Sequence, residues 1–209
     1  EEKKLSEIFE INSSKRIFHA QELEIFDIRE EWSFPYVVRS ALNNGVRWFV
    51  AEDVQYLNDG NTLSFAQDTF SVFYQKNPYF TGNKVKILKS KASWLSELSW
   101  LYLASTLNKV LQGFSWWVGS TVETIGEILF SIPIDKNWEI SFRYMEKYIQ
   151  ALEAERLEEL EAYLLATGLK DYQLTQKEQE SLDLFKKISI VKPTNQPTNQ
   201  PTNQPTNQP

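Results

Sequence analysis

The sequence contains no cysteine, one histidine and one methionine. Without cysteine the chain has no disulfide and no Cys-ligated zinc or iron–sulfur site. A single histidine also excludes every multi-histidine metal site. No run of 18 apolar residues is present, which excludes a membrane-spanning helix, and no charged-then-apolar leader opens the chain. These absences predict a soluble, cytoplasmic chain that holds no metal and does not contact a membrane. Because it begins at Glu1 rather than Met, we expect a fragment or a processed product.

The charge balance is acidic, with 22 Lys and Arg against 28 Asp and Glu, or −6 in total. DNA-binding domains usually carry basic patches, so the balance of the whole chain argues against a nucleic-acid ligand. One stretch departs from it: residues 76–91 hold lysines at 76, 84, 86, 89 and 91 and no acidic residue. Such a run is most often a solvated face, although it also suits contact with phosphates.

The C-terminal end is a repeat. Residues 193–208 read Pro-Thr-Asn-Gln four times, followed by Pro209. The repeat has no apolar side chain to bury, so it cannot offset the entropy lost on ordering. We therefore expect 191–209 to be a disordered tail with a polyproline bias.

The first 91 residues have the pattern of short strands separated by turns. Asn43-Asn44-Gly45 predicts a hairpin, because Asn and Gly tolerate positive φ. Further turns are expected at 58–61 and 81–83. In 84–89 charged and apolar residues alternate, which predicts a strand with one buried face and its lysines on an open face. The expected strands are 8–11, 24–28, 35–39, 46–50, 62–65, 69–74 and 84–89.

Helical periodicity takes over afterwards. Residues 92–112 predict a buried helix ending at Gly113, and 113–135 suggest short strands and loops that close the domain. A long helix is expected over 138–167, stopped by Gly168. At about 1.5 Å per residue it is too long for one small domain to cover, so its seam needs a partner helix, either 176–188 or a second copy of the chain. The seam residues are Phe142, Met145, Ile149, Leu152, Leu157, Leu160 and Leu164.

Catalytic signatures are missing. Asn77-Pro78-Tyr79-Phe80 is similar to the tetrapeptide with which amino-methyltransferases hold a target base, but no Gly-x-Gly turn accompanies it to bind S-adenosylmethionine, so we interpret it as a turn. Acid-x-Lys spacing suited to a nuclease occurs only at Glu1-x-Lys3 and Glu2-x-Lys4. There is no P-loop, and His19 has no nucleophile nearby. We expect no catalytic residue and no cofactor.

Polar groups at the turns offer a different chemistry. Arg can contact guanine with two hydrogen bonds, Asn and Gln can contact adenine, and Lys and Thr suit phosphates. The same residue types also serve ordinary turns, and these residues alone do not decide between the two roles. The candidate DNA-contacting residues are Lys15, Arg16, Arg39, Asn43, Asn44, Arg47, Gln67, Thr69, Lys84 and Lys86.

One resemblance favours the DNA-contacting role. Within 36–89, the segments Tyr36–Ser40, Asn43–Arg47, Leu57–Thr62, Ser64–Thr69 and Tyr79–Leu88 resemble a target recognition domain of the type I restriction-modification specificity (S) subunits. Leu5–Ile11 is similar to the usual start of such domains, and 140–164 resembles the helical spacer that follows them. The resemblance covers roughly 1–185.

The resemblance implies a non-catalytic reader of double-stranded DNA. Such subunits grip a bipartite target and direct adenine methylation, and cleavage, by methyltransferase (M) and restriction (R) subunits. They usually carry two recognition domains and two spacer helices, whereas this chain has one of each. It would therefore be a half subunit that forms a homodimer through the long helix, or part of a longer chain. A two-fold pair would read an inverted-repeat site.

The predicted fold is α+β: a β-rich globular recognition domain over 1–137, a helical spacer and dimerisation region over 138–190, and the tail over 191–209. Two other functions stay open at this point. The chain could be the recognition end of a single-chain methyltransferase–nuclease. Its many aromatic residues would also suit a module that binds carbohydrate or peptide.

Overall fold

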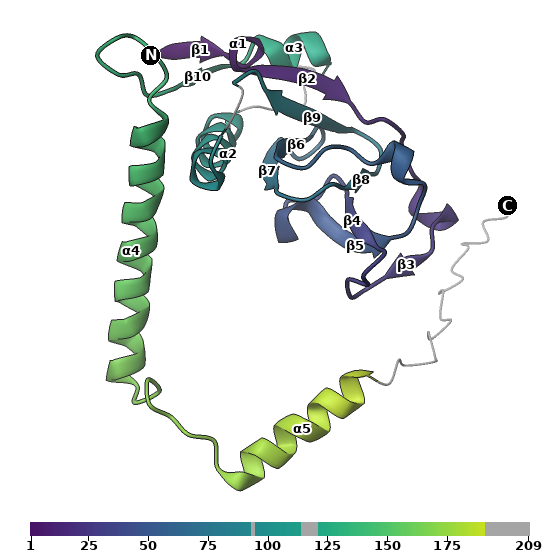
Figure 1. Cartoon of the computed structure of the whole chain (residues 1–209), viewed down its shortest axis with the longest axis vertical. Helices are drawn as coiled ribbons and strands as arrows, with labels where there is room; N and C mark the ends of the chain where they lie inside the picture. The colour runs from purple at the N-terminus through teal and green to yellow at the C-terminus, as the bar shows by residue number, and fades with distance from the viewer. Residues whose placement is uncertain (93–94, 114–120, 191–209) are drawn as a thin grey trace, which may run out of the picture. The chain divides into compact units, whose positions relative to one another are not determined.

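The computed structural model describes residues 1–92, 95–113 and 121–190, with the backbone only for 185–190. A β-rich part is followed by a long helix (Figure 1), which confirms the predicted α+β class. By its contacts the chain divides into the units Glu1–Leu157 and Glu158–Pro209. The first half of the long helix thus packs with the β-rich part. The functional division at 137 stays a prediction, and the predicted tail lies outside the described residues.

The first sheet has four antiparallel strands in the order β2-β9-β6-β7. Helix α2 packs against β7 and β6, and Figure 1 shows it beside this sheet. Leu103 and Leu107 of α2 share the main core cluster with Leu63 and Phe65 of β6. The elements are β2 (Phe9–Ser13), β6 (Thr62–Ala66), β7 (Ser71–Gln75), β9 (Val85–Ser90) and α2 (Glu97–Leu111).

Strand β9 lies inside this sheet and is covered on both faces. Leu88 belongs to the core under α2, whereas Val85 and Ile87 pack with Val37 and Tyr79. Alternate residues of a strand point to opposite faces, so these apolar side chains occupy both sides of β9. The prediction of one open face for its lysines is therefore wrong, because Leu88, on the same face as Lys86, lies in the core under α2, while the face of Val85 and Ile87 packs against the second sheet.

The second sheet has the order β3-β5-β4-β8. The predicted hairpin is present, and its second strand occupies the predicted residues 46–50. Its connection is longer than a two-residue turn: it runs over 38–45 and ends in the 3-10 turn η2 (Asn43–Gly45), where all three residues have positive φ. The strands are β3 (Ile25–Phe26), β4 (Phe34–Val37), β5 (Val46–Val50) and β8 (Phe80–Thr81), with the last two-residue strand parallel to β4.

The N-terminus helps to close the domain. Strand β1 (Glu2–Lys4) pairs with β10 (Leu129–Ser131). The short helix α1 (Leu5–Ile8) follows β1, the short helix α3 (Val122–Gly126) precedes β10, and the two helices contact each other. Of the predicted strands and loops of 113–135, residues 114–120 lie outside the described residues, and the remainder includes the helix α3, where Thr121 Oγ1 accepts a hydrogen bond from the Thr124 amide at 3.3 Å. Two further 3-10 turns are η1 (Ala20–Glu22) and η3 (Val54–Tyr56).

Gly113, which was predicted to end α2, does not form a left-handed cap. The helix ends at Leu111, and Gln112 follows in the right-handed α region. Among the glycines of the described residues, only Gly45 and Gly168 have positive φ. Gly168 does follow the end of α4, as its sequence position predicted.

Helix α4 (Phe142–Ala166) is the predicted long helix, and α5 (Gln176–Ile190) is the predicted shorter one. The start of α4 is four residues later than predicted. Asp135 Oδ1 accepts hydrogen bonds from the amides of Asn137 and Glu139, at 2.7 and 3.1 Å. This side-chain turn competes with the helix for the backbone donors, and Trp138 within it has a φ of +65°.

Candidate nucleic-acid interface

Several predicted DNA-contacting residues meet where three connections come together. Arg39 follows β4, Asp68 lies in the β6–β7 turn, and Lys84 precedes β9. The Asp68 carboxylate forms an ion pair with Arg39 and another with Lys84 Nζ at 3.0 Å. Gln67 and Thr69 flank Asp68, and the Gln67 amide donates to the carbonyl of Lys84 at 3.0 Å. These five residues are called the Asp68 corner below.

In the Asp68 corner one partly buried carboxylate forms ion pairs with two exposed cations. Partial burial acts to raise the pKa of Asp68, but hydrogen bonds and charge attraction from Lys84 and Arg39 outweigh it and leave this pKa below its ordinary value. Both cations remain exposed. Exposed ion pairs contribute up to about 1 kcal/mol each, so a phosphate oxygen can take the place of the carboxylate at small cost.

The connection over 38–45 links this corner to Asn43 and Asn44. It runs along β7: Ser71 Oγ donates to the carbonyl of Ser40 at 3.4 Å, and Gln75 Nε2 donates to the carbonyl of Asn44 at 2.8 Å. Asn43 Nδ2 donates to the carbonyl of Val46 at 2.9 Å. The two asparagines therefore lie on the same stretch of surface as the corner, at the opposite end of β7.

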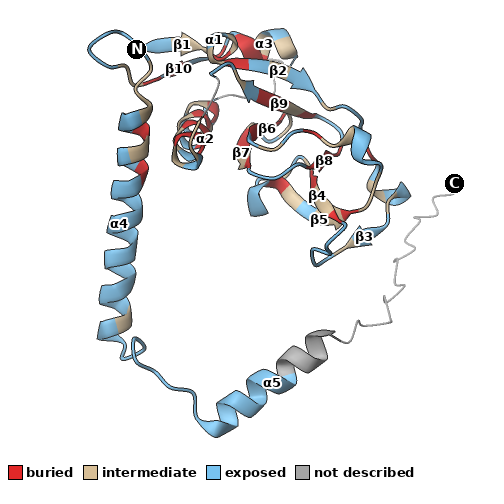
Figure 2. Cartoon of the chain, viewed as in Figure 1, coloured by how far each residue is buried: buried red, intermediate tan, exposed pale blue. Residues whose placement is uncertain are grey.

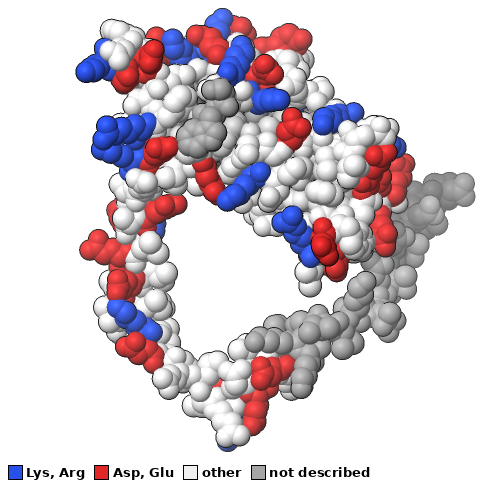
Figure 3. Space-filling model, in the orientation of Figure 1, with Lys and Arg blue, Asp and Glu red and all other residues white. Residues whose placement is uncertain are grey.

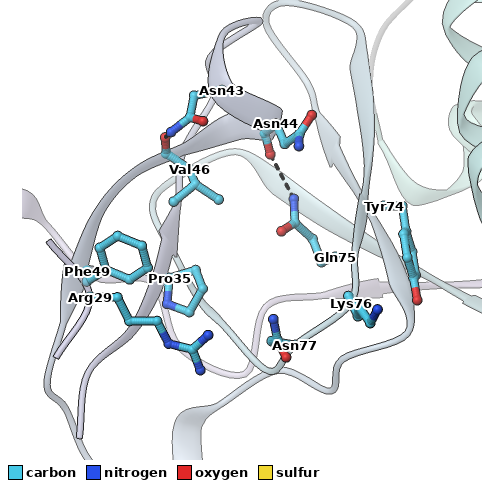
Figure 4. A pocket seen from close by; sticks show the side chains of 10 residues that line it. All are labelled: Arg29, Pro35, Asn43, Asn44, Val46, Phe49, Tyr74, Gln75, Lys76 and Asn77. Atoms are coloured by element: carbon cyan, nitrogen blue, oxygen red, sulfur yellow. Dashed lines mark hydrogen bonds between the residues drawn. The ribbon is translucent and has the colours of Figure 1, made fainter. Parts of the chain in front are cut away.

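A cavity of about 330 Å³ opens at that end of β7. Figure 4 shows Pro35 and Phe49 on one wall, Gln75 at the centre, and Arg29 and Asn77 reaching into the same space from the rim. Arg29, Gln75 and Asn77 are not among the residues predicted to contact DNA. They come from separate segments, and no spacing between them signals that they meet.

A second group of basic residues surrounds Asp59. Its carboxylate lies 3.6 Å from Lys15 Nζ and 3.5 Å from Lys89 Nζ. The buried side chain of Asn58 accepts a hydrogen bond from the Lys15 amide at 3.1 Å and so fixes the neighbouring backbone. Lys15 is thus placed with Lys89 and not with the Asp68 corner.

Two candidate arginines stack on aromatic rings. The Arg16 guanidinium lies 5.0 Å from the ring centre of Phe18 and 4.9 Å from that of Tyr56. Arg47 lies 4.4 Å from the ring of Trp48. Both arginines are exposed. Stacking holds the guanidinium plane and leaves its edge N–H donors for other acceptors.

The five lysines of 76–91 do not form one basic strip. Lys86 and Lys89 are three residues apart on β9, so they point to opposite faces. Figure 3 shows Lys and Arg interspersed with Asp and Glu over the face in view. The partners are Glu97 for Lys76, Asp68 for Lys84, Ser13 Oγ for Lys86, Asp59 for Lys89 and the Ser6 carbonyl for Lys91.

The long helix buries only part of its predicted seam, as Figure 2 shows. Met145 and Ile149 lie in the core of the unit Glu1–Leu157, with Phe142 half-buried beside them. Leu152, Leu157 and Leu160 are exposed, and Leu164 is half-exposed. The N-terminal part of the seam therefore fixes α4 to its own domain. The role of the remainder as a partner surface stays a prediction.

Within the described parts of the chain, no three His, Cys, Asp or Glu side chains gather closely enough to hold a metal ion. Across these same residues, no helix is long and apolar enough to cross a membrane. In the segment 77–80, Tyr79 and Phe80 are fully buried, which fits the interpretation of this tetrapeptide as a structural turn.

Three solved structures share the fold. The S subunit of a type I restriction-modification system from M. genitalium matches with a TM-score of 0.53 and 17% identity, over 84% of this chain and 46% of that one. The HsdS subunit from Thermoanaerobacter tengcongensis matches at 0.52 and 13%, over 91% and 44%. A chain from a structure on assembly and conformational transition of the type I R-M system matches at 0.54 and 15%, over 88% and 44%. This chain thus spans less than half the length of each.

A search of curated proteins gives no match. The model of the type I restriction modification DNA specificity domain, in contrast, matches residues 1–162, which include both four-stranded sheets and most of α4. A match over this much of the chain favours DNA specificity over the carbohydrate- or peptide-binding alternative. The chain belongs to the family of type I restriction-modification DNA specificity domains.

Proposed function

We propose that this chain reads one half of a bipartite DNA target and directs adenine methylation there by a partner M subunit, with an R subunit supplying cleavage. In this proposal the chain performs no catalysis itself. Family membership and the shared fold support the reading role. Because the chain spans less than half of the subunits that it matches, a second recognition unit would read the other half-site.

The observation that carries the proposal is the Asp68 corner and its continuation along β7. Arg39 and Lys84 share one carboxylate, and the connection over 38–45 carries Asn43 and Asn44 on the same surface. Base-reading and phosphate-binding side chains are thus held side by side on turns supported by buried strands. Such an arrangement suits groove contact, in which phosphates position the protein and base edges give specificity.

The exposed part of α4 is the proposed docking surface. Leu152 and Leu157 flank Leu160 on one side of the helix, since they precede it by eight and three residues. In the proposal these three leucines form a stripe that pairs with a second copy of the chain and supports the M subunit. A two-fold pair would place the two recognition units on an inverted-repeat site.

The test is co-expression of this chain with its cognate M subunit, followed by mapping of methylated adenines over the genome. We expect methylation at one bipartite motif, and none when either protein is left out. Tight, sequence-specific DNA binding by the isolated chain is not expected, because a half-site offers few phosphate contacts. Methylation that is independent of this chain, or without a shared motif, would contradict the proposal.

A further inference from the structure

The cavity beside β7 contains a buried amide with a fixed orientation. Gln75 is 6% exposed, and its Nε2 donates to the Asn44 carbonyl at 2.8 Å and to Ser64 Oγ at 3.0 Å. An amide nitrogen has two hydrogens, so both donors are used. Ser64 Oγ in turn donates to the carbonyl of Phe73 at 3.3 Å. Rotating the amide would place Oε1 against the Asn44 carbonyl, which has no hydrogen to donate, and the present orientation is therefore the one that the site imposes.

The free end of the amide is its acceptor. Oε1 points away from Asn44 toward the cavity (Figure 4), and among the described residues no donor reaches it. The Asn44 carbonyl that holds the opposite end belongs to a loop with its own hydrogen bonds: Asn43 Nδ2 donates to the carbonyl of Val46 and the Gly45 amide donates to that of Leu42, both at 2.9 Å. This hydrogen-bonded loop thus aims one hydrogen-bond acceptor into a small pocket.

The surroundings of this acceptor suit the edge of a nucleobase. Pro35 and Phe49 form an apolar wall, and the exposed Arg29 adds a positive charge to the rim, which attracts a polyanion. A volume of about 330 Å³ is at the small end for ligand sites. In the major groove adenine and cytosine present an amino donor, whereas guanine and thymine present a carbonyl acceptor at the corresponding place.

We propose that Gln75 is a specificity-determining residue: its Oε1 accepts a hydrogen bond from the exocyclic amino group of an adenine or cytosine in the target. The inference rests on the proposed function and gives one position of the half-site a defined chemistry. An amino base donates to Oε1, while a keto base would place a second acceptor against it. The pocket therefore separates A and C from G and T.

The test uses the whole chain with its M subunit and the methylated motif as readout. Gln75→Met keeps the length of the side chain and removes the acceptor. We expect one motif position that is restricted to A or C in the wild type to accept G or T, with discrimination lower by about 3- to 10-fold, the value of one net hydrogen bond. Gln112→Met, an exposed position after α2, is the matched control and should leave the motif unchanged.

Ser64→Ala provides a second, milder variant, which decides the matter if Gln75→Met does not fold. It removes one of the two acceptors that hold Nε2, so the amide can turn, and the same motif position should relax in part. Unchanged base preference in folded Gln75→Met, or in Ser64→Ala where the first variant is unfolded, overturns the inference alone. A wild-type chain that gives no motif would overturn the proposed function and this inference with it.

Discussion

Ser96 donates its hydroxyl hydrogen to the carboxylate of Glu146 over 2.5 Å and so ties the first turn of α2 to α4. The same Ser96 oxygen caps α2 by accepting from the amide of Ser99 at 3.3 Å. Three residues beyond Ser99 on α2, the ring of Tyr102 packs edge-on against the ring of Tyr148, with 5.5 Å between the ring centres. The base of α4 is thus locked to the helix that covers the first sheet.

This anchoring predicts effects of very different size for two apolar residues of α4. Met145 is fully buried, so Met145→Ala should lower the free energy of unfolding by about 2–5 kcal/mol, the usual cost of such a cavity. Leu157 is 66% exposed, and Leu157→Ala should change the free energy of unfolding by less than about 0.5 kcal/mol in dilute solution. Urea denaturation of both variants is the measurement. Equal losses would show that α4 is not anchored at Met145.

Charges placed on the exposed stripe should abolish association. Burying a leucine contributes about 1.5–3 kcal/mol, so Leu157→Glu with Leu160→Glu should weaken self-association or M-subunit binding by 100-fold or more. Sedimentation and co-purification measure the two partners separately. Ala151→Glu is the control, because Ala151 is exposed on the opposite side of the helix. Unchanged binding by the double variant would remove the stripe from the interface.

The two cations of the Asp68 corner should differ in their effects on specificity. Arg39→Ala should relax one position of the methylated motif, because an arginine contact to guanine is worth about 1–3 kcal/mol of discrimination. Lys84→Ala should instead lower methylation evenly at all sites, as expected for a phosphate contact. Lys136→Ala, an exposed lysine before α4, serves as the control. The same loss of motif in both variants would contradict the assignment of two roles.

Replacing Asp68 removes the carboxylate that Arg39 and Lys84 share. The pKa of Asp68 is lowered in the folded protein, so its contribution to stability is present above the pKa of an unfolded aspartate, about 3.9, and is lost as the pH falls through the lower folded value. Asp68→Asn should therefore unfold more easily at pH 7, by up to about 1 kcal/mol, and this difference should vanish in strong acid. Its binding to non-specific DNA should increase, since Arg39 and Lys84 lose a competing carboxylate. A stability difference that is independent of pH would contradict this account.

Local patterns predicted most of the strands and both long helices. The hairpin before Val46 followed from Asn-Gly chemistry, and the end of α4 followed from Gly168. Non-local contacts account for what was not predicted. The parallel pairing of β4 with β8 covers β9 with a second layer, and no spacing in the sequence signals that Tyr36 lies opposite Phe80.

The candidate interface shows the same limit. Residue type selected Arg39 and Lys84, and both are exposed in the structure, but their shared carboxylate depends on three connections meeting in space. Gln75 was not predicted as a DNA-contacting residue, because in the sequence it has the features of an ordinary strand residue. Its special position arises from Asn44 and Ser64, which hold its amide from two other segments.

The ion pairs at Asp68 and Asp59 also affect the number of phosphate contacts that the salt dependence of DNA binding would give. Each carboxylate binds two cations, so each group of three side chains carries a net charge of one. Small ions leave the DNA in proportion to the net charge that replaces them. The number of contacts inferred from ion release would therefore fall below the number of basic side chains that touch the backbone.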